Sequence, residues 1–194
     1  NANKLDASDR DVPGASNNGI INIRNWPVFG MYQPDAIASY RVNGETYLVT
    51  ANEGDTRDYP PGYSEEARVG SLTLDAAAFA AQGYSDVSDT TGLRNNDNLG
   101  RLIVTNANGA KELDSDPEFE RLYVPGGRSF SIRRADGSLV YDSGDDFEQR
   151  TKELVPAIFN SNGTVGTFDT RSDNKGPEPE AVAILPRRLN RNLR

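Results

Sequence analysis

The chain has 194 residues, a formal charge of −8, and neither cysteine nor histidine. Without cysteine it forms no disulfide, thiol nucleophile or zinc–thiolate site, and without histidine it holds no Ser-His-Asp triad and no histidine-ligated metal. The acidity argues against non-specific nucleic-acid binding. It favours a hard, oxygen-ligated cation, calcium or magnesium first, or an extracellular surface protein.

Many short elements are expected, because hydrophobic residues make up only 36% of the chain and there are 18 Gly and 11 Pro. An all-β single domain over residues 1–194 is the economical interpretation. No apolar run approaches the roughly 18 residues of a membrane span. Both ends, NANKLDASDRD and RRLNRNLR, look like cuts through a longer protein.

Residues 1–19 read as a polar loop and residues 20–23 as a short strand. The following residues 25–32 bring the only Trp, Trp26, and the only Met, Met31, together with further aromatic residues. The favoured interpretation is a core plug beneath the hairpin that comes next, and the alternative is an exposed aromatic platform.

The rest of the chain is organised like the stretch at residues 33–55. Residues 35–40 read as a strand buried on both faces, and residues 46–51 as a second strand. Asn43-Gly44 between them is the commonest two-residue hairpin turn. Four polar residues then follow a buried strand, as in a binding site at a sheet end or a solvated loop: Asn52, Glu53, Asp55 and Arg57.

Residues 56–98 are predicted to be an insertion between strands, with a helical turn beginning at Ser64 and a short helix over residues 71–83. Strands are then expected at residues 101–105 and 120–124. Two more, at residues 129–133 and 138–142, flank Asp136-Gly137, so an antiparallel meander is the natural architecture.

An acidic residue occupies every other position of one loop, namely Glu112, Asp114, Asp116 and Glu118. The alternation resembles a calcium loop but lacks the central Gly and terminal Glu of an EF-hand, so a solvated acidic loop is the stronger interpretation. Further on, residues 149–159 read as a helix. GPEPEAVAIL at 176–185 echoes QPDAIASY at 33–40, which indicates repeated, blade-like units.

Seven ordered motifs resemble the choice-of-anchor I domain family of secreted and surface proteins, across roughly residues 5–185. They are WPVFGMYQPDAIASY, YLVTANEGDTRDY with SEEARV, DNLGRL, GGRSFSI, LVYDSGDDFE, FNSN and RSDNKGPEPEAV. The resemblance implies a β-propeller of four-stranded blades, or part of one, exported from a bacterial cell. Some family members are named as atypical alkaline phosphatases, and others as esterase-like or cell-surface glycoprotein-like proteins.

In a propeller, the loops at the ends of the inner strands line the mouth of the channel. If residues 35 and 178 open equivalent inner strands, their acidic neighbours share one rim, where a cation would offset their repulsion. The sequence therefore predicts a divalent-cation site, calcium first, using some of Asp35, Glu53, Asp55, Glu178 and Glu180.

A metal-dependent phosphoesterase is the enzymatic hypothesis, and a non-enzymatic adhesion or surface-assembly module with structural calcium is the alternative. A phosphate ester needs cations to offset its charge, and the candidate catalytic residues are Glu53, Arg57, Arg128, Arg171 and Lys175. Other chains or copies that complete the propeller are the expected partners, since an open sheet leaves its edges uncovered.

Overall fold

The computed structural model describes residues 4–13 and 19–185. Strands dominate it and helices are few, which confirms the all-β expectation, although the described residues form no closed propeller or barrel. The strands are β1 (Lys4–Leu5), β2 (Arg24–Asn25), β3 (Val28–Gly30), β4 (Ala36–Val42), β5 (Glu45–Asn52), β6 (Asp58–Tyr59), β7 (Tyr63–Ser64), β8 (Glu66–Arg68), β9 (Ile103–Thr105), β10 (Leu122–Val124), β11 (Ser129–Arg134) and β12 (Leu139–Asp142). The helices are α1 (Ala76–Ala81), α2 (Asp146–Leu154) and the 3-10 turns η1 (Val69–Ser71), η2 (Pro156–Ile158) and η3 (Val165–Thr167).

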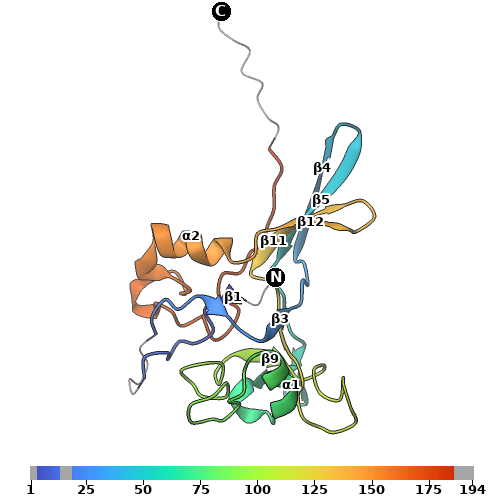
Figure 1. Cartoon of the computed structure of the whole chain (residues 1–194). Helices are drawn as coiled ribbons and strands as arrows, with labels where there is room; N and C mark the ends of the chain where they lie inside the picture. Colours follow the sequence, from blue (N-terminus) through green and yellow to red (C-terminus); the bar gives the residue numbers. More distant parts are fainter. Residues whose placement is uncertain (1–3, 14–18, 186–194) are drawn as a thin grey trace, which may run out of the picture.

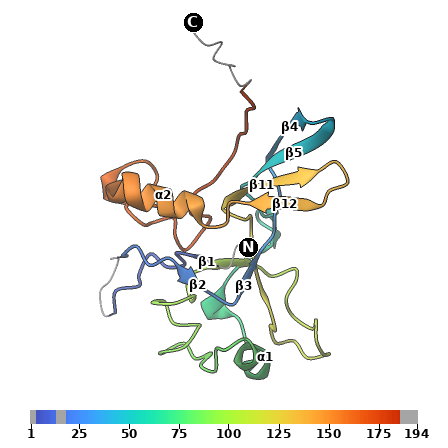
Figure 2. The ribbon, with the colours of Figure 1, turned by 45° about the horizontal axis from the view of Figure 1, so that its top comes forward.

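One antiparallel sheet, in the order β12-β11-β5-β4, projects from the rest of the molecule (Figures 1 and 2). The β4–β5 hairpin turns at Asn43-Gly44, whose φ values of 51° and 86° confirm the predicted turn. β4 is not buried on both faces as expected. It is an outer strand whose burial alternates, and 63% of the Ile37 side chain is exposed.

The hydrophobic core lies elsewhere, below this sheet in Figure 1, around β3, β9 and β10. Trp26 and Val28 belong to it, so the core-plug interpretation is confirmed for these two residues, whereas Phe29 is exposed and Met31 lies outside the core. Their neighbours are Leu5, Val69 and other core residues rather than the β4–β5 hairpin, so the expected position beneath the hairpin is wrong. The guanidinium of Arg24 caps the plug, 3.7 Å from the centre of the Trp26 ring.

The long connection from β5 to β11 departs from the sequence prediction near Ser64. No helical turn begins there. Instead β6 pairs with β7 and β8 pairs with β9, because the Glu65 carboxylate accepts hydrogen bonds from the backbone and side chain of Arg57 and holds the segment extended. Strand β2 likewise begins after the predicted strand at residues 20–23.

Both predicted helices exist with shifted bounds. α1 is shorter than predicted because the Asp75 carboxylate caps it, accepting from the backbone N–H groups of Ala77 and Ala78. α2 begins at Asp146, three residues before the prediction, and ends at Leu154. None of the helices in the described ranges has the length and apolar character needed to cross a bilayer.

The segment 176–185 does not repeat the β4 strand. It pairs with no strand of the described chain and runs away from the body of the molecule (Figures 1 and 2). The start of the segment is held firmly, since Gly176 donates to the Arg171 carbonyl and the preceding Lys175 reaches the loop after β5. The predicted echo of the first hairpin is therefore absent as secondary structure.

Candidate functional site

The loop after β5 meets the segment 171–178 and forms an acidic rim with a lysine at its centre. The Lys175 ammonium lies 2.9 Å from Glu53 Oε1, 3.7 Å from Asp55 Oδ1 and 3.5 Å from Glu178 Oε1. Arg171 also pairs with Glu178. The structure thus brings together five residues that the sequence assigned to the site.

Lys175 stays protonated in this position. Burial disfavours the charged ammonium, but the hydrogen bond to Glu53 and the charges of Glu178, Glu53 and Asp55 hold the pKa of Lys175 above its ordinary value. An ammonium therefore offsets the repulsion among carboxylates that the sequence analysis assigned to a divalent cation.

Two glycines bring the backbone of the rim into close contact. Gly54 and Gly126 have φ values of +77° and +74°, and a Cβ on Gly54 would lie 1.9 Å from the backbone nitrogen of Gly126. Gln33 joins the two loops, accepting from Gly54 through its backbone carbonyl and from Gly126 through its side chain. Asp35, Glu53 and Asp55 line the resulting pocket of about 260 Å³.

The remaining predicted site residues lie outside the lysine-centred group. Glu180 is exposed on the segment that leaves the body. Arg57 forms its ion pair with Glu65 and lines a separate open pocket of about 850 Å³ that Asp55 also borders. Arg128 is 5% exposed and points into the interior.

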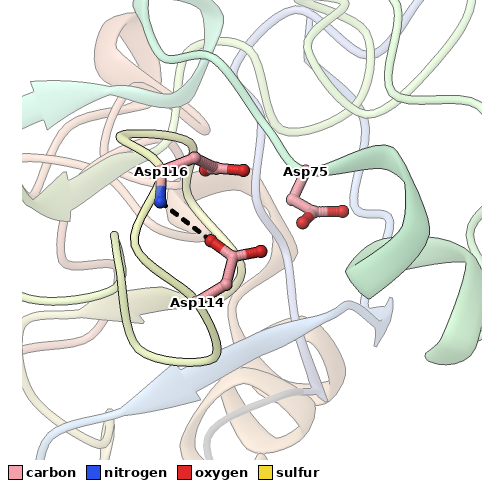
Figure 3. Close-up of side chains that lie close together, drawn as sticks. All are labelled: Asp75, Asp114 and Asp116. Carbon is pink, nitrogen blue, oxygen red and sulfur yellow. Dashed lines mark hydrogen bonds between the residues drawn. The ribbon is translucent and has the colours of Figure 1, made fainter.

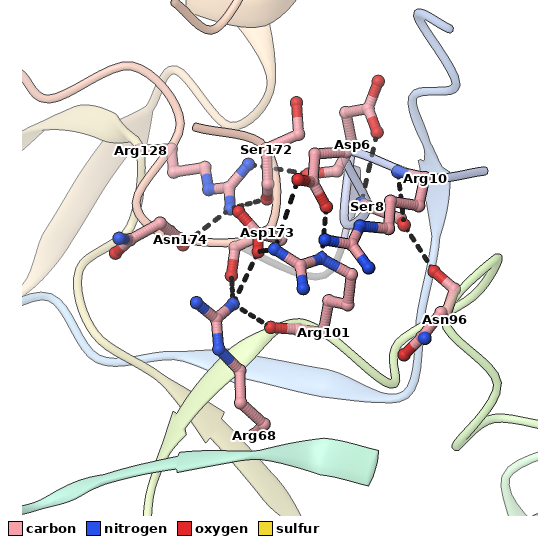
Figure 4. Close-up of polar contacts among 11 residues, drawn as sticks. Asp6, Ser8, Arg10, Arg68, Asn96, Arg101, Arg128, Ser172, Asp173 and Asn174 are labelled. Atoms are coloured by element: carbon pink, nitrogen blue, oxygen red, sulfur yellow. Dashed lines mark hydrogen bonds and ion pairs between the residues drawn. The ribbon is translucent and has the colours of Figure 1, made fainter. Parts of the chain in front are cut away.

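Arg128 is the centre of a buried polar network that joins distant parts of the chain (Figure 4). Its guanidinium pairs with Glu148 of α2 at 2.7 Å and donates to the backbone carbonyls of Asp6, Ser172 and Asn174. Glu148 in turn accepts from the backbone of Asp6. These contacts tie the residues after β1 to β11, α2 and the chain that leads to the rim.

Next to this network lies a buried acidic cluster that we define as Asp6, Asp11 and Asp169. Burial, with added repulsion from Asp6, raises the pKa of Asp169 to about 9. Burial, together with the charges of Glu148 and Asp11, raises the pKa of Asp6 to about 7. The sequence analysis missed this cluster because it read residues 1–19 as a solvated loop, although the three Asp residues of LDASDRD were the available signal.

A second acidic group, the surface triad of Asp75, Asp114 and Asp116, joins α1 to the loop with alternating acidic residues (Figure 3). One carboxylate oxygen from each lies within 4.8 Å of the others. Asp114 and Asp116 are exposed, and each accepts a hydrogen bond from a backbone N–H two residues further on. Such solvated turns occur without an ion, so the calcium-loop and solvated-loop interpretations both stay open.

Comparison with known proteins finds two similar proteins. The chain is similar to a mesenchyme-specific cell surface glycoprotein of Strongylocentrotus purpuratus, 28% identical over 207 aligned positions that cover 93% of this chain and 25% of the relative. It is also similar to Gigasin-3a of Magallana gigas, 38% identical over 92 residues, or 44% of this chain and 31% of the relative. The chain therefore spans less than a third of either relative's length, and no solved structure matches it significantly.

The sequence profile of the choice-of-anchor I domain matches residues 1–188. The match covers the projecting sheet, the core and the rim alike. This protein belongs to the choice-of-anchor I domain family.

Proposed function

We propose that this chain is an extracellular or cell-surface assembly module, and that its projecting sheet is one blade of a β-propeller. The observation that carries the proposal is the exposure of large apolar side chains on both outer strands of the sheet. On β12, the consecutive residues Leu139, Val140 and Tyr141 are each more than 40% exposed, and on β4 Ile37 and Val42 are exposed. Consecutive strand residues point to opposite faces, so both faces carry apolar surface.

Such a sheet is typical of a blade that packs against neighbouring sheets. The relatives are more than three times as long as the part that aligns, which leaves room in them for further sheets of this kind. The name of the sea urchin relative supports an extracellular location. The bacterial origin expected from the sequence stays a prediction.

The test is self-association of the 194-residue chain, in which a second copy supplies the neighbouring sheet. Sedimentation velocity should show concentration-dependent association that Ile37→Lys with Val140→Lys abolishes without lowering the melting temperature. The matched control is Leu154→Lys with Val165→Lys, which are as exposed but lie on α2 and η3. A wild-type chain that stays monomeric at every concentration, or equal loss in both pairs of variants, contradicts the proposal.

A metal-dependent phosphoesterase at the rim is the second candidate function, favoured by the gathering of Glu53, Asp55, Glu178, Arg171 and Lys175. Two cationic side chains suit a phosphate ester, and the carboxylates suit calcium. A bound calcium ion would supply Lewis-acid activation, with Glu53 as the base that accepts a proton. Both cations are already paired with carboxylates, however, so substrate and metal must compete with these ion pairs.

Hydrolysis of p-nitrophenyl phosphate with and without calcium distinguishes the two functions. The enzyme hypothesis expects calcium-dependent turnover that Glu53→Gln removes and Glu153→Gln, on the exposed face of α2, preserves. Absence of turnover at saturating calcium contradicts the phosphoesterase hypothesis and leaves the assembly module as the proposed function.

A further inference from the structure

The acidic cluster of Asp6, Asp11 and Asp169 is almost completely removed from solvent. The residues are 1%, 7% and 0% exposed, although the third is more than 150 positions from the others in the sequence. Burial of several carboxylates in one place is unfavourable unless each finds a compensating partner. The partners of each group therefore determine what the cluster can do.

One short segment contacts all three carboxylates. The backbone N–H of Asn22 donates to Asp6 Oδ2 at 2.7 Å, and that of Ile20 donates to Asp11 Oδ1 at 2.8 Å. Asp169 Oδ2 lies against Gly19 so closely that a Cβ there would be 1.5 Å from it. The three carboxylates thus flank four consecutive backbone positions.

Three basic side chains nearby are committed to other acids. Arg128 pairs with Glu148. Arg101 pairs with Asp9, and both Arg101 and Arg68 contact Asp173 (Figure 4). Within the described residues, no ion pair reaches Asp6, Asp11 or Asp169. Asp11 and Asp169 each also have a buried carboxylate oxygen, Oδ2, that accepts no hydrogen bond from a described residue.

Two buried, unpartnered carboxylate oxygens beside a third buried carboxylate have the chemistry of a hard-cation site. We propose that Asp6, Asp11 and Asp169 bind a divalent cation, calcium by preference, inside the contact between the N-terminal segment and residues 169–174. Calcium takes six to eight oxygen ligands in flexible geometry. Backbone carbonyls and water can complete the shell, whereas magnesium requires a stricter octahedron.

Ion binding must draw the side chains together. Among the described residues, only the surface triad has three carboxylates within 4.8 Å of one another, so the cluster is more widely spaced. Rotation of the Asp11 and Asp169 side chains, whose Oδ2 atoms are free, shortens this spacing. Calcium tolerates such adjustment better than magnesium does.

Isothermal titration of the chelator-treated chain with calcium chloride, paired with thermal melting, tests the site. We expect one calcium per chain and a rise in melting temperature on binding. Asp169→Asn should weaken calcium binding by more than about tenfold. Loss of a group that only orients a metal ligand already costs about tenfold, and Asp169 is proposed as a ligand itself. Without calcium this variant should melt near the wild-type temperature, because the amide is isosteric with the carboxyl and its oxygen can accept the same hydrogen bond from Ser172.

Two matched controls locate the ion. Asp114→Asn in the surface triad and Glu53→Gln at the rim test the two competing locations, and both variants retain wild-type calcium affinity if the ion lies in the buried cluster. Loss of affinity in either control, with affinity retained in Asp169→Asn, overturns the proposal and assigns calcium to that other group. Absence of heat and of a melting shift in the wild-type chain also overturns it. If Asp169→Asn fails to fold, the calcium affinity of Asp11→Asn is judged by the same criteria. The assembly function is tested independently, by the separate measurement of self-association.

Discussion

Lys175 determines the charge balance of the rim. Its single positive charge lies among Glu53, Asp55 and Glu178, which together carry three negative charges when ionised. Opposite charges at such distances stabilise one another, and removal of the lysine leaves Glu53 and Asp55 without a cation, while Glu178 keeps Arg171. The sequence analysis assigned the repulsion among these carboxylates to a divalent cation. It could not show that a side chain 122 positions from Glu53 brings a positive charge among them.

Lys175→Gln should turn the rim into a calcium-binding group. The amide keeps most of the length of the side chain but removes the cation shared by Glu53, Asp55 and Glu178, of which only Glu178 keeps another partner, Arg171. Calcium titration should therefore detect a site additional to any in the wild-type chain. Lys152→Gln on the exposed face of α2 is the control and should add none. An unchanged number of calcium sites in Lys175→Gln contradicts this prediction.

Glu65 makes stability dependent on acidic pH. Its hydrogen bonds with Arg57 lower the pKa of Glu65 to about 2 from an unfolded value near 4.5. A carboxyl with a depressed folded pKa contributes stability above its unfolded pKa, and this contribution is lost as the pH falls from 4.5 towards 2. Melting temperatures of the wild type should therefore fall more steeply over this range than those of Glu65→Gln. Glu153→Gln, whose partner Arg150 is exposed, should follow the wild type.

The buried acidic cluster could not be predicted from the sequence residue by residue. Asp6 and Asp11 lie in a polar stretch typical of a surface loop, and Asp169 follows a turn-rich segment. Only tertiary packing buries them together and raises the pKa of Asp6 and Asp169. Sequence periodicity carries no information about such contacts between irregular segments.

At the scale of elements, local chemistry predicted hairpins better than helices. Asn43-Gly44 and Asp136-Gly137 turn where expected because glycine accepts a positive φ. The helix predicted at Ser64 is absent because Glu65 bonds to Arg57, a contact across a hairpin that helix rules do not include. The helix at residues 71–83 shortened because Asp75 is a better N-cap than Ser71.

Asp75 should set the stability of α1. Its carboxylate satisfies two N–H groups at the start of a six-residue helix, so Asp75→Ala should lower the free energy of unfolding by about 1 kcal/mol. Urea denaturation of Asp75→Ala measures the loss, and Asp75→Asn should recover most of it because the amide oxygen also caps. Equal destabilisation by Ala and Asn would show that the charge, rather than the cap, stabilises this position.

For the whole molecule, the strands of the sheet could be predicted but their arrangement could not. The strands do not form a simple antiparallel meander, since β5 pairs with β11 across a long connection and β10 pairs with β3 in parallel. The four strands were recognised from β-branched residues and turns, and the all-β class follows from them. The core assembled instead from Leu5, Trp26, Leu102 and other residues of short or irregular segments, which have no period to detect. The closed propeller remains a prediction, since the described residues show a single four-stranded sheet.

Arg128 should be the most sensitive polar position of the fold. Arg128→Met leaves Glu148 as a buried, uncompensated carboxylate and removes donors from three backbone carbonyls. A loss of about 3–5 kcal/mol in the free energy of unfolding is expected. Arg150→Met, which breaks the exposed pair with Glu153 on the same helix, should cost at most about 1 kcal/mol. A loss below about 1 kcal/mol in the free energy of unfolding of Arg128→Met would show that the network around Arg128 contributes little to the stability of the fold.

The contact between Gly54 and Gly126 limits how this domain can diversify. A Cβ on Gly126 would lie 1.8 Å from the carbonyl oxygen of Glu53, and one on Gly54 would meet the backbone of Gly126. Backbone atoms cannot move aside as a flexible side chain can, so neither position has an acceptable substitute among the other amino acids. In a saturation library selected for folding, both codons should therefore stay fixed while the neighbouring rim residues vary. Changes in the chemistry of this surface must then come from exchange of side chains on an unchanging loop backbone.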